Sequence, residues 1–230
     1  MKTPLLSLLA GTTLLLAGAC ARGTTDVEQP NAAAREIDRA SAADATPGGP
    51  TYVEPAARKT APDHRKDIKT ADALLETTPR DVDALLMRAR AKSQLKDYRE
   101  AMVDYNAAVQ LEPTNSEVYY NRGLNRLEMK EFSGAISDFG KATKYNPQDR
   151  DAFFGRGSAK MQMYNYRSAI PDFTKAIALD PNYADAYEYR GISYSSINKP
   201  KEARADLEKA AQLNPAAEKS LRRYVGNKDK

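Results

Sequence analysis

Few side chains of this chain have the reactivity that catalysis or metal binding requires. The sequence holds one cysteine, Cys20, and one histidine, His64. His64 stands at the start of an expected helix without partners at ligand spacing, so we interpret it as a surface histidine. Carboxylates are numerous, but none stands in a distinctly apolar setting, and no glycine-rich phosphate loop follows a strand. The sequence therefore predicts no enzyme, no metal site and no cofactor, and it leaves Cys20 as the residue most suited to covalent chemistry.

Cys20 follows a segment with the composition of an export signal. Lys2 supplies one positive charge, and the apolar stretch from Leu5 to Ala19 is too short to span a membrane comfortably. The end of this stretch, Leu16-Ala17-Gly18-Ala19-Cys20, resembles the lipoprotein box of bacteria, in which the thiol carries diacylglycerol. We therefore expect a signal peptide at 1–19 and lipidation at Cys20. The same small residues also suit ordinary signal peptidase, so plain secretion is the alternative.

The residues after the cysteine indicate a location and a tether. The first of them is Ala21 rather than aspartate. By resemblance to lipoproteins of Gram-negative bacteria, this implies an exported, lipid-anchored protein on the periplasmic face of the outer membrane. Residues 20–61 contain few large apolar side chains and many Ala, Thr, Pro and Gly. We expect a disordered tether there, since such a segment buries too little surface to offset the entropy of ordering.

The remainder of the chain repeats with a period of 34 residues. Proline recurs at this interval without insertion or deletion, at Pro79, Pro113, Pro147, Pro181 and Pro215. Alanine fills one column completely, at Ala101, Ala135, Ala169 and Ala203, and a bulky apolar residue fills another, at Tyr105, Phe139, Phe173 and Leu207. Each block holds two amphipathic segments separated by a short polar turn. A fixed period of this length indicates stacked supersecondary units rather than a single globular core.

These columns resemble the tetratricopeptide repeat, and the resemblance covers about 139 of 230 residues. It implies an all-α fold, a right-handed superhelical solenoid of antiparallel helix pairs. The four repeats are then 82–115, 116–149, 150–183 and 184–217. Because the ends of such an array need solvated caps, we expect capping helices at 62–79 and 218–230, the second with a basic tail.

Two charged columns stand where core residues are expected. One is arginine and the other aspartate in all four repeats, at the same spacing. An arginine stem can line an apolar seam while its guanidinium binds a carboxylate through two hydrogen bonds. We therefore predict a structural ladder between the two helix types, within a repeat or between adjacent repeats. Its members are Arg88, Asp104, Arg122, Asp138, Arg156, Asp172, Arg190 and Asp206.

The concave face of such a solenoid is lined by the first helix of each repeat, and this is where the family generally binds partners. The residues expected there are aromatic, aliphatic and polar, a mixture that suits an apolar or extended peptide segment. The alternative for the aromatic members is that they pack between neighbouring first helices. The predicted binding residues are Arg90, Tyr120, Asn121, Leu124, Phe154, Ser158, Tyr189 and Ile192.

Charge and family resemblance together favour a protein-binding function. The net charge is +4, from 35 basic and 31 acidic residues, and this small excess does not indicate nucleic-acid binding. We expect a membrane-anchored scaffold or adaptor of the bacterial envelope that binds a protein or an extended peptide and contacts the membrane through the lipid at Cys20. The alternative is an assembly factor, resembling a pilotin or an outer-membrane complex subunit, for a pilus, a secretin or an insertion machine. The sequence does not fix the oligomeric state.

Overall fold

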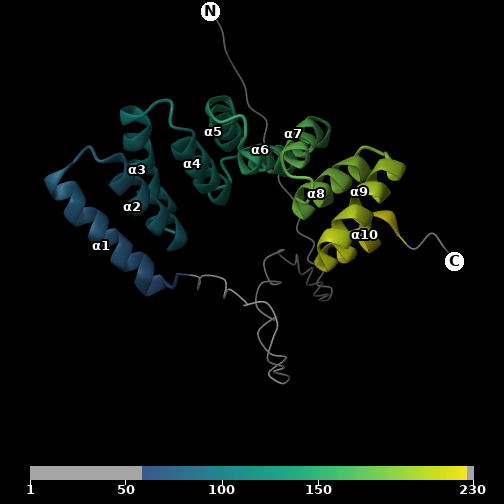
Figure 1. Ribbon diagram of the computed structural model, residues 1–230, viewed down its shortest axis with the longest axis horizontal. Helices are drawn as coiled ribbons and strands as arrows, with labels where there is room; N and C mark the ends of the chain where they lie inside the picture. The colour runs from purple at the N-terminus through teal and green to yellow at the C-terminus, as the bar shows by residue number, and fades with distance from the viewer. Residues whose placement is uncertain (1–58, 227–230) are drawn as a thin grey trace, which may run out of the picture. The chain divides into compact units, whose positions relative to one another are not determined.

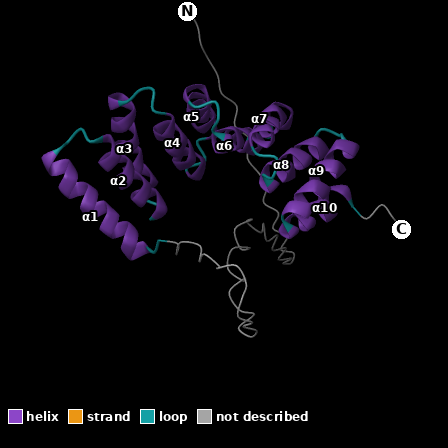
Figure 2. Ribbon diagram, viewed as in Figure 1, coloured by secondary structure: helices purple, strands orange, loops and turns teal. Residues whose placement is uncertain are grey.

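The computed structural model describes residues 59–226, and every regular element in this range is helical (Figures 1 and 2). The signal peptide, Cys20 and nearly all of the predicted tether lie outside the described residues. The helices are α1 (Ala61–Thr77), α2 (Val82–Gln94), α3 (Tyr98–Leu111), α4 (Ser116–Glu128), α5 (Phe132–Tyr145), α6 (Arg150–Gln162), α7 (Tyr166–Leu179), α8 (Ala184–Ser196), α9 (Pro200–Leu213), the short 3₁₀ helix η1 (Pro215–Ala217) and α10 (Glu218–Val225).

Local sequence explains where the first helix of each repeat begins. Asp81, Asn115 and Asp149 occupy the N-cap positions of α2, α4 and α6, and each side chain accepts a backbone N–H of the first turn. These bonds satisfy donors that a helix start otherwise leaves without a partner. The fourth repeat differs, because Tyr183 occupies the N-cap of α8 and makes no such bond. The position that holds a capping side chain in three repeats therefore holds the aromatic residue Tyr183 in the fourth.

The turn inside each repeat uses a left-handed residue. Lys96, Lys130, Tyr164 and Asn198 have φ between 58° and 69°, always at the same position of the repeat. This conformation suits glycine or asparagine, whereas a side chain such as Lys or Tyr is strained in it. Three of the four repeats thus accept local strain in order to place their second helix.

Each helix packs against the next helix in the chain, from α1 to α10. In addition, the first helices touch one another, α2 with α4, α4 with α6 and α6 with α8. The first helices therefore form one continuous surface, called here the first-helix face, and the second helices lie behind it. This arrangement confirms the predicted all-α solenoid of helix pairs.

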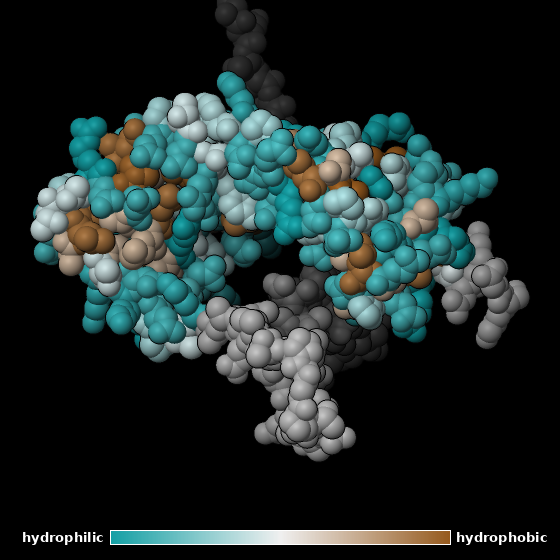
Figure 3. All heavy atoms as spheres, viewed as in Figure 1, coloured by the Kyte–Doolittle hydropathy of each residue, from teal (hydrophilic) through white to brown (hydrophobic). Residues whose placement is uncertain are grey.

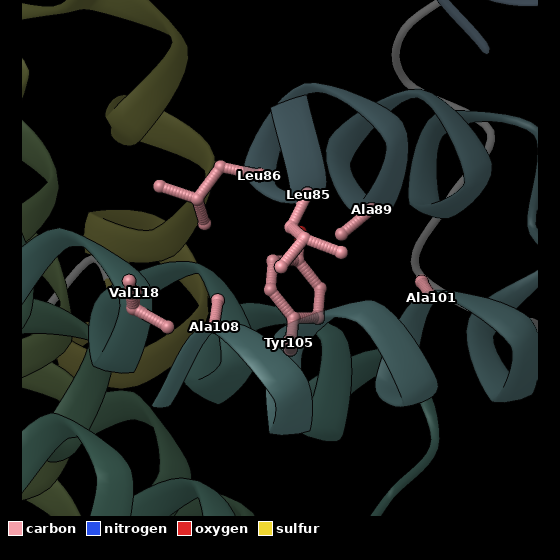
Figure 4. Packing of buried hydrophobic residues seen from close by; sticks show 7 residues of the cluster. All are labelled: Leu85, Leu86, Ala89, Ala101, Tyr105, Ala108 and Val118. Atoms are coloured by element: carbon pink, nitrogen blue, oxygen red, sulfur yellow. The ribbon is translucent and has the colours of Figure 1, made fainter. Parts of the chain in front are cut away.

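The core is a series of small clusters distributed along the array rather than one central core. In the first cluster, Leu85 lies against Tyr105 while Ala89, Ala101 and Ala108 allow α2 and α3 to approach closely (Figure 4). Phe139, Phe173 and Leu207 occupy the place of Tyr105 in later repeats and are fully buried. Close approach is strict at Gly155 and Gly157, where an added Cβ would lie 2.7 Å from the Phe139 and Phe173 rings respectively.

The end helices lie close to their predicted positions. α1 spans Ala61–Thr77 and packs on α2, and α10 spans Glu218–Val225 and packs on α8 and α9. In the view of Figure 3, small hydrophobic patches interrupt a mainly hydrophilic surface. Within residues 59–226, no helix is both long and apolar enough to cross a bilayer.

Candidate functional site

Two adjoining cavities open at the N-terminal end of the first-helix face. The larger, about 860 Å³, is lined by residues of α1, α2 and α4 together with Lys59. The smaller, about 350 Å³, lies between α2, the turn after it, α3 and α4. Arg90, Gln94 and Asn121 line both cavities. Together the cavities form a surface called here the N-terminal groove, and it contains the predicted residues Arg90, Asn121 and Leu124.

The N-terminal groove combines apolar walls with amide and charged groups. Leu86 is buried beneath it, whereas Met87 and Leu124 expose about a third of their surface, at 36% and 37%. The Arg90 guanidinium pairs with the Glu117 carboxylate and so joins α2 to α4. Asn121 donates to the backbone oxygen of Glu117, and no residue within 59–226 donates to its side-chain oxygen. An apolar wall beside an amide oxygen that is free to accept a hydrogen bond suits an extended peptide as ligand.

The floor of the smaller cavity is fixed by Asn125, which is buried. Its amide donates to the backbone oxygen of Tyr98 at 2.9 Å, and its oxygen accepts the Ser93 hydroxyl at 2.7 Å. Both ends of this amide are therefore occupied within the protein. Asn125 positions the wall, whereas Asn121 has capacity left for a ligand.

The predicted aromatic residues lie farther along the first-helix face, on α4, α6 and α8. Tyr120, Phe154 and Tyr189 are half-buried, and each packs against a ring of a second helix. The ring centroids are 5.9 Å apart for Tyr120 and Phe139, and 5.2 Å apart for Phe154 and Tyr189. The Phe154–Tyr189 contact joins two neighbouring first helices, as in the packing alternative, whereas the contacts with Phe139 and Phe173 are to second helices. Each of the three residues also keeps part of its surface exposed.

Tyr183 joins this aromatic group, and the sequence prediction missed it. Its ring lies 5.1 Å from that of Phe154, and the Arg150 guanidinium stacks on it at 4.8 Å. Burial, followed by the neighbouring Asp151 carboxylate, raises the pKa of Tyr183. Burial and then Asp151 also raise the pKa of Tyr120, to about 12. The signal in the sequence was the loss of the Asn or Asp cap at position 183.

The two remaining predicted binding residues are partly buried on α6 and α8. The Ser158 hydroxyl oxygen is inaccessible to solvent and has no hydrogen-bond partner within residues 59–226. Ile192 is partly buried, and its backbone oxygen accepts the Ser196 hydroxyl at 2.9 Å. Neither residue lines the two cavities of the N-terminal groove.

The eight ladder residues form four pairs, each within one repeat. In the second repeat, Arg122 donates from Nε to Asp138 at 2.9 Å and from Nη2 at 2.6 Å, and both side chains are buried. The same pairing joins Arg88 to Asp104, Arg156 to Asp172 and Arg190 to Asp206. A planar guanidinium that meets a carboxylate in this way fixes the angle between two helices as well as their distance.

Each arginine also reaches the helix just before its own repeat, which is α1 for Arg88 and the second helix of the preceding repeat for the other three. The partners of its remaining nitrogen are Asp72, Asn106, Thr143 and Thr174. The ladder therefore links helices within a repeat and between repeats at once. Sequence reasoning missed a second cation on three of the aspartates, supplied by Lys92, Arg126 and Lys160. These three share one column of the repeat, so the pattern was present in the sequence.

His64 differs from its predicted surface position. Its side chain is only 16% exposed and forms part of the wall of the larger cavity, near Asp67. The residue lies in the first turn of α1, and the cavity that it lines is also bounded by residues of α2 and α4. Within residues 59–226, no group of three His, Cys, Asp or Glu side chains is placed to hold a metal ion.

Comparison with known proteins identifies the repeat. Three profiles described as TPR or tetratricopeptide repeats match residues 89–129, residues 116–149 with 151–183, and residues 173–205. No curated protein matches the sequence significantly.

Solved structures show the same fold at low sequence identity. The crystal structure of MamA matches with a TM-score of 0.64 and 24% identity, over 69% of this chain and 92% of that one. A MamA structure from Desulfovibrio magneticus RS-1 gives 0.63 and 19%, over 67% and 87%. YrrB, described as a TPR protein with an unusual peptide-binding site, gives 0.62 and 20%, over 70% and 84%. The helical array of this chain is therefore built of tetratricopeptide repeats.

Proposed function

We propose that this protein is a membrane-anchored scaffold of the bacterial envelope that binds an extended segment of a partner protein along its first-helix face. The observation that carries the proposal is the N-terminal groove, in which two adjoining cavities bring Arg90, Asn121 and Leu124 together. Similarity to YrrB, which is described as having a peptide-binding site, supports the same kind of ligand.

The chemistry of the N-terminal groove suits an extended chain better than a compact small molecule. The two cavities adjoin along α2 and α4 and share a border at Gln94 and Asn121. Amide side chains can hydrogen-bond to the backbone of a peptide, while Leu124 and Met87 accept its apolar side chains. Arg90 lines both cavities, and its ion pair with Glu117 is partly exposed, so a ligand can compete for either partner at low cost.

The proposed membrane anchor is a lipid attached to Cys20. A cysteine after Leu16-Ala17-Gly18-Ala19 has the pattern of a bacterial lipidation site, and acyl chains on it would hold the repeats near a membrane surface. Ala21 supports the periplasmic face of the outer membrane as the location. Replacing Cys20 by Ser in the full chain should move the protein from the membrane fraction to the soluble fraction and abolish labelling with a palmitate analogue.

A crosslinked pull-down from the cell envelope tests the N-terminal groove. Leu124→Arg places a long charged side chain in the smaller cavity and should abolish recovery of the specific partners. Val103→Arg is the matched control, because Val103 is 67% exposed on α3 and lines none of the described cavities. Circular dichroism should show equal helicity for both variants.

The outcomes separate the proposal from its alternatives. Partners lost with Leu124→Arg and kept with Val103→Arg would support binding in the N-terminal groove. If those partners were components of a pilus, a secretin or an insertion machine, the assembly-factor function would be favoured over an adaptor. Equal recovery with both variants would refute the N-terminal groove as the binding site.

A further inference from the structure

The first-helix face changes character between its two ends. At the second, fifth and thirteenth positions of the last three repeats, the first helices α4, α6 and α8 carry five acids and no lysine or arginine: Glu117, Glu128, Asp151, Asp185 and Glu188. Glu117 is paired with Arg90, and Asp151 lies 3.6 Å from Arg150, which also pairs with Asp180. No lysine or arginine within residues 59–226 forms an ion pair with Glu128, Asp185 or Glu188.

Acids and tyrosines interleave along this end of the face. The members, called here the acidic tyrosine strip, are Tyr120, Asp151, Tyr183, Asp185, Glu188 and Tyr189. After burial, Asp151 and Asp185 raise the pKa of Tyr183, and Glu188 and Asp185 raise that of Tyr189. Asp185 therefore acts on both Tyr183 and Tyr189, and Asp151 acts on both Tyr183 and Tyr120.

Tyr183 adds an independent indication that the strip is more than packing. The equivalent residues Asp81, Asn115 and Asp149 each cap a helix, and an N-cap is worth about 1 kcal/mol. In α8 the cap is absent, and the residue instead contributes a half-buried ring beside Phe154 and Asp151. The fourth repeat therefore lacks the stabilising cap at this position and has the exposed part of the Tyr183 ring there instead.

The strip already accommodates a guanidinium group. Arg150 stacks on the Tyr183 ring at 4.8 Å while it pairs with Asp180 and approaches Asp151. Arg150 is about half exposed, so this contact is open to exchange with a cation from outside. Aromatic faces flanked by carboxylates bind lysine and arginine side chains by cation–π attraction and by charge-assisted hydrogen bonds.

We propose that the acidic tyrosine strip binds lysine or arginine side chains of the partner, so that the segment held on the first-helix face is a basic one. This inference rests on the proposed scaffold function and adds the chemistry of its ligand. Half-buried rings supply the contact area, and Asp151 and Asp185 supply the charge that selects basic over neutral or acidic segments.

Binding of three defined peptide mixtures to the full chain tests the inference. The mixtures consist of fluorescein-labelled peptides of about 12 residues. Random apolar residues alternate in them with Lys in the first mixture, Gln in the second and Glu in the third. We expect anisotropy to report the tightest binding for the Lys mixture, and this binding should weaken as NaCl rises from about 0.05 to about 0.3 M.

Substitutions then place the effect on the strip. Asp151→Asn combined with Asp185→Asn should weaken binding of the Lys mixture about tenfold and leave the Gln mixture unchanged. Glu202→Gln is the control, because Glu202 also lies in a first turn but on the second helix α9. Thermal melts should show that all variants remain folded.

Each result bears on the inference separately from the scaffold function. Equal binding of all three mixtures, or an unchanged affinity in the Asp151/Asp185 variant, would overturn the selection for basic segments. The absence of any peptide binding would overturn it as well. In all of these cases the Leu124→Arg pull-down still decides the scaffold function, because that result depends on the N-terminal groove and on no charged residue of the strip.

Discussion

Replacement of Asp138 by Asn should destabilise the repeats strongly. Asp138 is 1% exposed and accepts three hydrogen bonds, two from Arg122 and one from Arg126 at 2.7 Å. An asparagine keeps one acceptor oxygen but turns an N–H₂ group toward a guanidinium donor. Arg122 is then left buried without its counter-charge, and water has little access to it.

The expected cost is about 3–5 kcal/mol, the range for breaking a buried ion pair by removing one partner. A protein of this size changes its melting temperature by roughly 2–4 °C per kcal/mol, so the loss corresponds to about 6–20 °C. Asp206→Asn should cost less, since Asp206 is bound by Arg190 alone and the column that supplies the second cation holds Tyr194 in that repeat.

Urea unfolding followed by circular dichroism measures these differences in the full chain. Glu131→Gln is the matched control, because Glu131 also faces Arg126 but at 3.7 Å and with 49% of its side chain exposed. An exposed pair of this kind contributes at most about 1 kcal/mol. If Asp138→Asn and Glu131→Gln lowered the free energy of unfolding equally, the ladder would not be a source of stability.

Two further predictions concern the left-handed turns and the buried tyrosines. Tyr164 has φ 58° and is 81% exposed, so Tyr164→Gly should stabilise the protein by about 0.5–1 kcal/mol in urea unfolding, whereas Tyr164→Ala should give no gain. Tyr120 has its pKa raised to about 12, mainly by burial. A group whose folded pKa is raised contributes stability that is complete below its unfolded pKa of about 10 and is lost as pH rises toward about 12. Urea midpoints should therefore fall between about pH 10 and 12, and Tyr120→Phe should make that fall shallower; an identical fall in both proteins would contradict the assignment.

The sequence alone determined the architecture, because the repeat places the same steric demand on the same column four times. The small alanine side chains at 101, 135, 169 and 203 allow two helices to approach closely at the same position of every repeat, and this indicates the same helix pair in each unit. The two amphipathic segments of the first repeat accordingly form α2 (Val82–Gln94) and α3 (Tyr98–Leu111), one on each side of the polar turn. The arginine and aspartate columns were equally visible in the sequence, since a fully charged column within a core pattern requires a partner.

Only the tertiary structure decided which partner each charged ladder residue binds and how far each aromatic ring is buried. Arg122, for example, lies on a first helix between two second helices, and it binds Asp138 of its own repeat and Asn106 of the preceding one. Sequence spacing alone could not distinguish pairing within a repeat from pairing between repeats. The surroundings of His64, Asp151 and Tyr183 likewise depend on helices that are distant in the sequence. Burial of a side chain is a property of several neighbouring helices together, whereas a repeat pattern records only what each helix contributes.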